Sequence, residues 1–572
     1  MAGLSIFARA RPPPVESVLR TMRRRHARNL GHCNKNETRI VMLKRRTLAT
    51  AAAASLLLPR GLRADTPRQG GTIRYMAPYG TSFSTLDILA STITQDQIWA
   101  KALHRSLYNW DSFAKKPVLD LATSVTSSAD GMTHTYKLRD DAYFHNGRKM
   151  TADDIVWTYN HIMTPANTCS GTSFIVVIAG AADVQSGKAK TISGLRKIDD
   201  HTLEITLTQK TDPGYYLFDP TTTIYPATEA AMPEFKTHPI GLGPYKFVEY
   251  VPGSRLVGER WKKFYVPGKP HADRVIISIM GDAAARDIAF RNGELDASIL
   301  GPTQYLLYSR DPKLSKRLED VAEYYTRVIG FNPAYKPFAD RRIRQAINYA
   351  INSELIIARL AKGKAYRATG WLPISSSAYD SSEKPYAYDP GRAKKLLAEA
   401  GYPNGFTFEC TATSNESWGV PIVEAAATML EKVGVKVKIK PVESTVLDDV
   451  VVKGEFQAFM WSLQTGPDPF FALNQLASTT PATGGNYVRY RNPHFDALLG
   501  QAAKAGDAAS RLALLKKANA VIHDDAPFWF FNYNKAVMAY QPWLHGLQPD
   551  ANDLSLQNYE DMWVGASSPA AK

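Results

Sequence analysis

Residues 406–440 read FTFECTATSNESWGVPIVEAAATMLEKVGVKVKIK, and this stretch decides the fold class. Apolar side chains alternate with others over residues 406–410, which predicts a buried strand that contains Cys410. Apolar residues then recur at helical spacing over 422–433, and residues 435–440 alternate valine or isoleucine with lysine, as in a half-exposed strand. Strand, helix and strand in this order form a βαβ unit with parallel strands and a right-handed crossover. We therefore predict an α/β fold, in which ligands tend to bind at the carboxyl ends of the strands.

Two marked helices precede this unit. One is expected to begin after Asp340, because the residues that follow place apolar side chains three and four positions apart. The other is expected to begin with Asp389 and Pro390, an N-cap followed by a first-turn proline, and to end at Gly401. The body of the chain therefore combines amphipathic helices with short strands.

The positive charge of the chain lies almost entirely in its first residues. The 572 residues carry a formal net charge of +15, but residues 1–64 hold 14 of the 69 Lys and Arg residues and only two of the 54 acidic residues. The remainder is close to neutral and has no basic stripe of the kind that binds a phosphate backbone. We therefore expect no nucleic-acid partner, and the length predicts two or three domains.

Residues 42–64 have the composition of an export signal. Met42 opens a short basic segment, residues 48–58 are apolar and rich in Ala and Leu, and residues 62–64 resemble a cleavage site. The mature chain is therefore expected to begin near Asp65. The adjacent Arg45 and Arg46 also fit the twin-arginine route, and the sequence leaves this route and the general secretory route open.

Two further expectations follow from the leader. Residues 1–41 form an upstream extension that is either disordered or untranslated, which leaves Met1 and Met42 as alternative starts. No cysteine follows the apolar segment at a lipid-attachment position. We therefore expect a soluble periplasmic protein without a lipid anchor.

The mature part of the chain lacks the motifs that carry common chemistry. It has no HExxH, paired CxxC, GxSxG, Walker-type or complete GxGxxG sequence. Its histidines do not cluster at the i, i+3 or i+4 spacing that holds a bare ion. We therefore expect no enzyme activity, no catalytic residue, no cofactor and no metal site.

A series of short sequence blocks runs through most of the chain in a fixed order. From about residue 70 to residue 563 this order resembles the peptide/nickel class of ABC-importer solute-binding proteins, the family 5 extracellular solute-binding proteins, which includes dipeptide and oligopeptide binders. Each block is weak alone, and their common order and spacing carry the resemblance. The blocks are LDLA (119–122), ADGMTHTYKLR (129–139), FHNG (144–147), MTADDI (150–155), GLGPY (241–245), NGELD (292–296), FN (331–332), PFADRRIRQA (337–346), YDPGRAKKLLAEAGYP (388–403) and GEF (454–456) before Trp461.

The resemblance implies a two-lobed periplasmic-binding-protein fold with a hinge between the lobes and an extra subdomain in the larger lobe. We expect the first lobe at residues 65–330, with the subdomain at roughly 110–235. The second lobe is expected at 331–532, and residues 533–572 return to the first lobe. The chain would cross between the lobes near 327–332 and 530–533. Cys169 and Cys410 then fall in different lobes, and we expect them not to pair, since a bridge would hold the cleft shut.

The resemblance also implies a function. The protein would capture a peptide or a peptide-like small polar solute in the cleft and deliver it, as a monomer, to the permease subunits of an ABC transporter in the inner membrane. Ligand contacts to both lobes would shift an open–closed equilibrium. Two alternatives stay open: a binding protein that presents its ligand to a chemosensory receptor, and, with less support, an exported hydrolase.

The family pattern also selects candidate ligand-binding residues. They lie after the tryptophan of the second lobe, after the first predicted strand (residues 72–76), in the loop after the strand at 406–410, and near the second crossing. The candidates are Trp461, Ser462, Leu463, Gln464, Asp468, Tyr79, Thr81, Phe83, Asn415, Trp418 and Tyr533.

Two anchors of a zwitterionic dipeptide are expected to be missing. Dipeptide binders of this class place an aspartate for the ligand ammonium at the position where this chain has Gln464, with Asp468 out of register. They also place an arginine for the ligand carboxylate in the loop that here reads TSNESW (413–418). We therefore expect a modified peptide, an opine-like conjugate or an oligosaccharide to fit at least as well as a dipeptide.

Overall fold

The computed structural model describes residues 66–571 except residues 81, 92 and 415. The upstream extension, the export signal and the expected first mature residue therefore lie outside the described residues. Residues 67–572 form one compact unit. None of the described helices has the length and the apolar character that crossing a bilayer requires.

The first lobe contains a four-stranded sheet. β1 (Thr72–Ala77) pairs in parallel with β10 (Arg274–Ile279), and β9 (Arg255–Arg260) and β8 (Tyr245–Val251) follow in antiparallel order. The strand predicted at 72–76 is thus confirmed. The same apolar core takes in side chains from the last part of the chain. The remaining elements of this core region are α1 (Thr94–Leu103), α5 (Ala283–Arg291), β11 (Ala297–Ile299), α6 (Pro302–Arg310), β18 (Leu544–His545) and β19 (Trp563–Val564).

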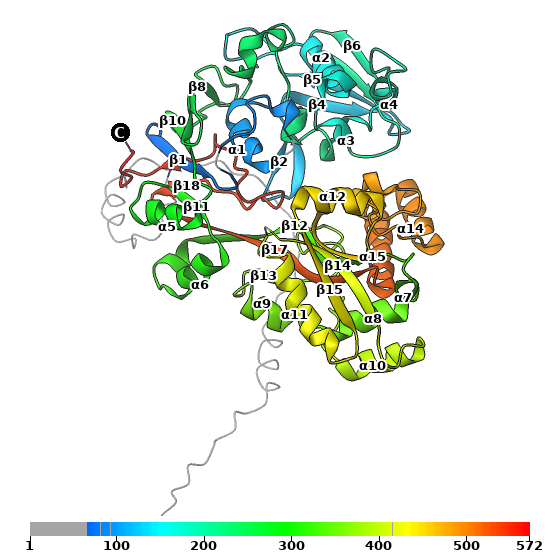
Figure 1. The fold of residues 1–572 in the computed structure, drawn as a ribbon. Coiled ribbons are helices and arrows are strands. Elements are labelled where there is room, and N and C mark those ends of the chain that lie inside the picture. The colour runs from blue at the N-terminus through cyan, green and yellow to red at the C-terminus, as the bar shows by residue number, and fades with distance from the viewer. Residues whose placement is uncertain (1–65, 81, 92, 415, 572) are drawn as a thin grey trace, which may run out of the picture. The chain divides into compact units, whose positions relative to one another are not determined.

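A second antiparallel sheet, with strand order β4-β5-β7-β6, forms a subdomain of the first lobe. Figure 1 shows it in cyan at the top of the view, next to α2. α2 begins after Thr151, whose backbone N–H donates to the side chain of Asp154 at 3.0 Å. The elements are β2 (Tyr108–Asp111), β3 (Lys116–Leu119), β4 (Ala122–Ser127), β5 (Thr133–Leu138), α2 (Ala152–Met163), α3 (Thr172–Ile175), α4 (Ala181–Gln185), β6 (Leu195–Asp199) and β7 (Thr202–Thr206).

The βαβ unit predicted at 406–440 is confirmed in the second lobe. β14 (Thr407–Thr413) leads into α11 (Val420–Glu431) and β15 (Lys436–Val442), and the strands pair in parallel from Thr407–Lys436 to Thr413–Val442. The valines and isoleucine of β15 are less exposed than its lysines, as the alternation predicts. β16 (Ala458–Gln464) lies on the other side of β14, also in parallel.

Helices cover this sheet, and both predicted helix starts are confirmed. α8 (Arg341–Ala350) is capped by Asp340 and α10 (Pro390–Glu399) by Asp389, each through a side chain that accepts from a backbone N–H of the first turn at 2.9 Å. The other elements of the second lobe are α7 (Lys336–Ala339), α9 (Ser353–Arg359), β13 (Ala365–Arg367), α12 (Ser444–Lys453), α13 (Pro469–Asn474), α14 (Pro493–Lys504) and α15 (Ala508–Asp525).

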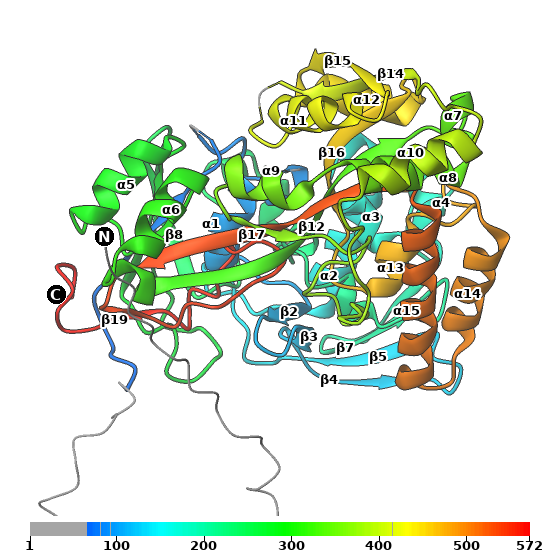
Figure 2. The same ribbon diagram turned by 90° about the horizontal axis from the view of Figure 1, so that it is seen from below.

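Two long strands, β12 (Leu318–Phe331) and β17 (Phe528–Tyr540), connect the lobes and are seen side by side in Figure 2. They pair antiparallel, but the register breaks between Ala322 and Thr326. On β12, residues up to Tyr324 pack in the first-lobe core and residues from Val328 pack in the cores of the second lobe. We infer that the hinge lies at this break.

The two cysteines of the described chain are free. Cys410 is fully buried on β14, as its strand pattern predicts, and burial raises the pKa of its thiol. Cys169 is half-buried in the subdomain, where burial raises the pKa of its thiol to about 12. Neither thiol is therefore primed to react near neutral pH.

Candidate functional site

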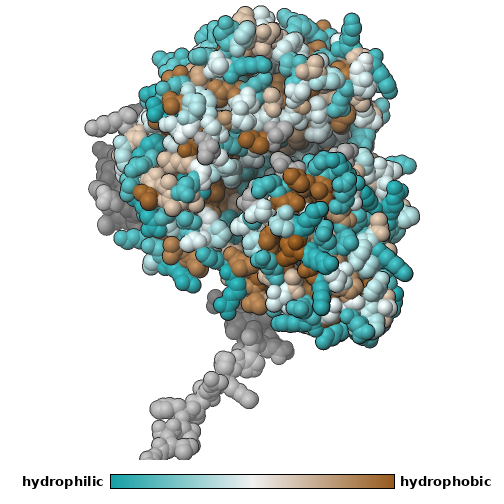
Figure 3. Space-filling view, viewed as in Figure 1, coloured by the Kyte–Doolittle hydropathy of each residue, from teal (hydrophilic) through white to brown (hydrophobic). Residues whose placement is uncertain are grey.

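A cavity that opens to solvent lies between the lobes. Figure 3 shows the surface hollowed in this region. The wall combines residues of α1, the subdomain, the crossing strand β12, the loop after β16 and the C-terminal segment. Sequence positions that are hundreds of residues apart thus meet around one space. The charged and amide residues of the wall are Gln97, Lys101, Arg105, Asn109, Asp120, Asp219, Gln464, Gln475, Asp550, Asn552 and Asp553.

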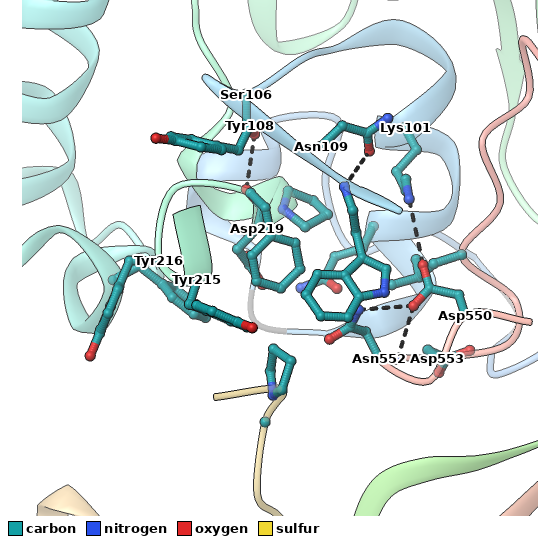
Figure 4. Close-up of a pocket in the computed structure, with 18 of the residues that line it drawn as sticks. Lys101, Ser106, Tyr108, Asn109, Tyr215, Tyr216, Asp219, Asp550, Asn552 and Asp553 are labelled. Carbon is teal, nitrogen blue, oxygen red and sulfur yellow. Dashed lines mark hydrogen bonds and ion pairs between the residues drawn. The ribbon is translucent and has the colours of Figure 1, made fainter. Parts of the chain in front are cut away.

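Two cations from α1 and its C-terminal end enter the wall, and both are paired. Lys101 Nζ lies 3.7 Å from Asp550 Oδ2, a pair that is drawn in Figure 4. Arg105 forms an ion pair with the buried Glu560, and its Nε lies 3.6 Å from Asp120 Oδ2. Burial lowers the pKa of Lys101 and raises the pKa values of Asp550 and Asp120. These cations therefore serve mainly to neutralise buried carboxylates of the same wall.

Two carboxylates of the wall have no ion-pair partner in the described part of the chain. Asp219 accepts from the backbone N–H of Thr221 at 2.8 Å and thereby caps a short 3-10 turn. Asp553 accepts from the phenol of Tyr79 at 3.1 Å and from the backbone N–H of Ser555 at 2.8 Å. Burial raises the pKa of both side chains.

Aromatic rings line much of the remaining wall. Trp110 lies with its ring centroid 5.1 Å from Phe218 and 6.2 Å from Tyr215. Tyr216 of the subdomain meets Phe471 of the second lobe edge to face at 6.2 Å. The wall is thus able to pack apolar groups, to stack planar groups and to attract cations through ring faces.

Glu323, Tyr325 and Arg327 stand at alternate positions of β12, which puts them on one face of the strand, but Glu323 and Arg327 are not among the residues that line the cavity. Tyr325 lines the cavity. Glu323 is 4% exposed and accepts a hydrogen bond from Leu554 N at 2.9 Å. Its pKa is raised to about 8, first by burial and then by the negative charge of Asp553.

Arg327 is the cation of this face. Its guanidinium lies over the ring of Trp418, 5.5 Å from the centroid, and burial lowers its pKa to about 10. No carboxylate of the described residues lies within ion-pair distance of it, and its Nε–H has no acceptor among them. Arg327 is thus a charged donor on the hinge strand, available to an anionic group.

The structure separates the predicted residues of β16. Gln464 is exposed, lines the cavity and is the register partner of Tyr325 on the neighbouring strand β12. Ser462 is the register partner of Arg327 and lies on the same face of β16 as Gln464. Trp461 and Leu463 point to the opposite face, where they pack in the second-lobe core, with Trp461 5.2 Å from the ring of Tyr487. Strand alternation thus turns Trp461 away from Gln464, and its predicted role as a cleft platform stays a prediction.

The other candidates also divide. Trp418 packs beside Arg327, and Tyr79 is bonded to Asp553 at the cavity wall. Phe83 is buried against Trp99 and Tyr250 and does not line the cavity, and its contact with a ligand stays a prediction. Thr81 and Asn415 lie outside the described residues.

Two further candidates lie away from the cavity. Tyr533 is wholly buried in the second-lobe core, where its hydroxyl accepts from Thr369 N at 3.1 Å and Gly370 N at 3.0 Å. Asp468 caps α13 through Phe470 N at 3.0 Å and lines a separate hollow beside Arg511. Neither residue lines the cavity in this structure, because Tyr533 completes a core and Asp468 caps a helix, and their contacts with a ligand stay predictions.

The sequence analysis missed two wall residues, Asp219 and Asp553, and the cation of the hinge strand, Arg327. Asp219 and Asp553 follow no motif and reach the cavity only through the tertiary fold. Arg327 had a signal: in the part of the strand that reads VAEYYTRVIGF (321–331), Glu323 and Arg327 are the charged residues of a mainly apolar run. Charges spaced in this way on a buried strand indicate a functional face.

The chain is similar to known solute-binding proteins over most of its length. Residues 116–484 match the family described as bacterial extracellular solute-binding proteins, family 5 middle. The glutathione-binding protein GsiB of Shigella boydii is 30% identical over 492 residues, which cover 82% of this chain and 91% of that protein.

Solved structures share the fold. The periplasmic binding protein DppA from Helicobacter pylori, in complex with the peptide STSA, gives a TM-score of 0.70 at 23% identity and covers 87% of this chain and 99% of its own. HbpA2 from Haemophilus parasuis gives 0.74 at 22% identity, with 86% and 100% covered. The predicted two-lobed α/β fold is confirmed.

Proposed function

The chain belongs to the bacterial extracellular solute-binding proteins of family 5, and on this premise we propose that it captures a short zwitterionic peptide between its lobes and hands it to an ABC permease. The relative at 30% identity is named for glutathione, which is itself a modified tripeptide. In this proposal the protein acts as a monomer in the periplasm, without a lipid anchor.

The observation that carries the proposal is the separation of opposite charges along β12, the strand from which Tyr325 reaches the cavity. Arg327 offers a cation at one point of β12, and Asp553 offers a carboxylate near the other end of the same face, beside Glu323. A peptide with a free ammonium and a free carboxylate matches both. The anchors expected to be missing are thus supplied from other elements, the hinge strand and the C-terminal segment.

The spacing of these groups favours a ligand longer than a dipeptide. Glu323, which neighbours Asp553, and Arg327 are four positions apart on the strand, and this corresponds to about 13 Å along the backbone. An extended peptide covers at most about 3.5 Å per residue, so three or four residues fill the gap. An opine conjugate carries similar charges, whereas a neutral oligosaccharide would leave Arg327 without a partner.

Binding across the hinge supplies the mechanism of capture. A ligand that contacts β12, the first-lobe wall and Gln464 of the second lobe stabilises the form in which these surfaces are close. Its binding free energy therefore shifts the protein toward the closed form, which the permease would recognise.

A calorimetric ligand screen with a matched pair of variants tests the proposal. Dipeptides, tripeptides, glutathione, an opine and a trisaccharide are titrated into the wild-type protein, Arg327→Gln and the control Arg359→Gln, whose side chain is exposed on α9. We expect the tightest binding from a tripeptide-length zwitterion and a loss of about tenfold or more in Arg327→Gln only, since a charge-assisted hydrogen bond contributes roughly 1.5–3 kcal/mol. Preferential binding of the trisaccharide, or an unchanged affinity in Arg327→Gln, would contradict the proposal.

A further inference from the structure

The cavity contains more carboxylates than its own cations neutralise. Lys101 faces Asp550, and Arg105 faces both Asp120 and Glu560, so two cations meet three carboxylates within the first-lobe wall. Asp219 and Asp553 remain without an ion-pair partner in the described chain. One ligand ammonium, at Asp553, would still leave the Asp219 carboxylate uncompensated.

The carboxylates of Asp553 and Asp219 both influence Tyr325, a residue of the cavity wall. Burial raises the pKa of the Tyr325 phenol, and the negative charges of Asp553, Glu323 and Asp219 raise it further. Three acidic groups from the C-terminal segment, the hinge strand and the subdomain thus lie around one ring. In Figure 4, Asp219 lies on the side of Tyr215 and Tyr216, opposite Asp550 and Asp553. The groups next to Asp219 in the cavity therefore differ from those next to Asp550 and Asp553.

Those surroundings are aromatic. Tyr215, Tyr216 and Phe218 belong to the same short segment as Asp219, and all of them line the cavity. Ring faces attract ammonium and guanidinium groups, and a carboxylate at the same place strengthens the attraction. This combination favours a cation with an apolar stem.

A buried, unpartnered donor independently indicates that a polar ligand enters this region. Trp110 lines the cavity with 2% of its surface exposed, and its indole N–H has no acceptor among the described residues. Leaving a buried N–H without an acceptor is costly, so a ligand oxygen is its natural partner. The carbonyl oxygens of a peptide backbone have this chemistry.

We propose that Asp219, with Tyr215, Tyr216 and Phe218, forms a subsite for a cationic side chain of the ligand. The preferred ligand is then a short peptide with a lysine-, ornithine- or arginine-type side chain. Its ammonium terminus lies at Asp553, its carboxylate at Arg327 and its second cation at Asp219. This inference rests on the proposed function and makes it specific. It also separates this chain from a glutathione binder, because glutathione has two carboxylates and one ammonium.

The chain offers a matched control for Asp219. Asp212 and Asp219 both precede a proline and cap a 3-10 turn, accepting from a backbone N–H at 2.9 and 2.8 Å. Asp219 lines the cavity and Asp212 does not. Asp219→Asn and Asp212→Asn therefore remove the same charge from the same local structure, and each asparagine keeps an oxygen that can cap the turn.

The test measures dissociation constants of the full chain by calorimetry. The ligands are alanine tripeptides with lysine, norleucine or glutamate at each position in turn, together with glutathione. We expect one lysine peptide to bind at least tenfold more tightly than its norleucine counterpart and than glutathione. Asp219→Asn is expected to remove this preference without weakening the norleucine peptide, and Asp212→Asn is expected to keep it.

The outcomes separate the inference from the proposed function. Equal binding of lysine and norleucine peptides, tighter binding of glutathione, or an unchanged lysine preference in Asp219→Asn would overturn the cationic subsite and leave peptide capture standing. Failure of every peptide and of glutathione to bind would overturn both. If Asp219→Asn lowers the melting temperature, the affinities of the wild-type protein for the lysine peptides, the norleucine peptides and glutathione decide whether the cationic subsite exists.

Discussion

Replacement of Glu323 by glutamine should change how stability depends on pH. Glu323 lies on β12 at the register break between the lobes and is almost fully buried. It is bonded to Leu554 N and to the side chain of Asn534, and burial raises its pKa to about 8. The charged groups around it are Asp553, which raises its pKa, and Lys364, which lowers it.

The sign and size of the effect follow from this pKa. Between its ordinary value of 4.5 and about 8, the folded protein keeps a proton on Glu323 that the unfolded chain releases, so stability falls as pH rises. The slope is about 1.4 kcal/mol per pH unit, or roughly 3 kcal/mol from pH 5 to pH 7.5. Lys364, whose pKa burial lowers from 10.5 to about 8, titrates above this window. Glutamine cannot ionise and removes the slope.

Differential scanning calorimetry from pH 5 to pH 7.5 measures the effect. A chain of this size has an unfolding entropy of about 1 kcal/mol per kelvin, so Glu323→Gln should gain roughly 3 °C over the wild type across this range. Glu424→Gln, an exposed change on α11, serves as the control and should follow the wild type. A Glu323→Gln curve parallel to the wild-type curve would refute the reasoning.

Two further predictions test the second lobe. Tyr533→Phe removes the hydroxyl that accepts from the buried Thr369 N and Gly370 N, so thermal unfolding should show a free energy of unfolding lower by about 1–3 kcal/mol. Peptide affinity should not change. A tenfold loss of affinity would instead show that the Tyr533 hydroxyl contributes to ligand binding. The Trp371 ring stacks on Phe528 at a centroid distance of 5.1 Å, and its indole N–H donates to Ala472 O at 2.8 Å. Trp371→Ala should therefore lower the free energy of unfolding by about 3–5 kcal/mol, and Trp371→Phe should lower it by less. Equal losses in the two variants would show that the ring packing contributes little.

The fold could be predicted where the signal is local. The alternation over 406–410 and 435–440 and the helical spacing between them lie within one short stretch, and the βαβ unit has the parallel pairing that they indicate. Asp340 and Asp389 likewise cap helices through atoms two or three residues away. Such patterns depend on neighbours in the sequence, which the sequence itself displays.

The site could be predicted only in part, because its residues meet through the tertiary fold. Gln464 was found from its offset from Trp461 in the family pattern that the chain resembles, and the structure puts it in the cavity wall. Asp219 and Asp553 come from segments 334 residues apart, and nothing local distinguishes them from surface aspartates. The two-residue period of β16, which points Trp461 toward the second-lobe core, becomes visible only once the strand and its register are known.

The break in the pairing of β12 and β17 has a consequence for anyone who wishes to convert this protein into an optical sensor. A ribbon that is hydrogen-bonded on both sides of a short gap bends at the gap, so residues beside it act as a pivot and travel little. Tyr325 lies on this pivot, whereas Phe471 lies out on α13. A pair of dyes should therefore be attached on the subdomain and on α13, where a small rotation produces the largest displacement, and the pivot should be left unlabelled.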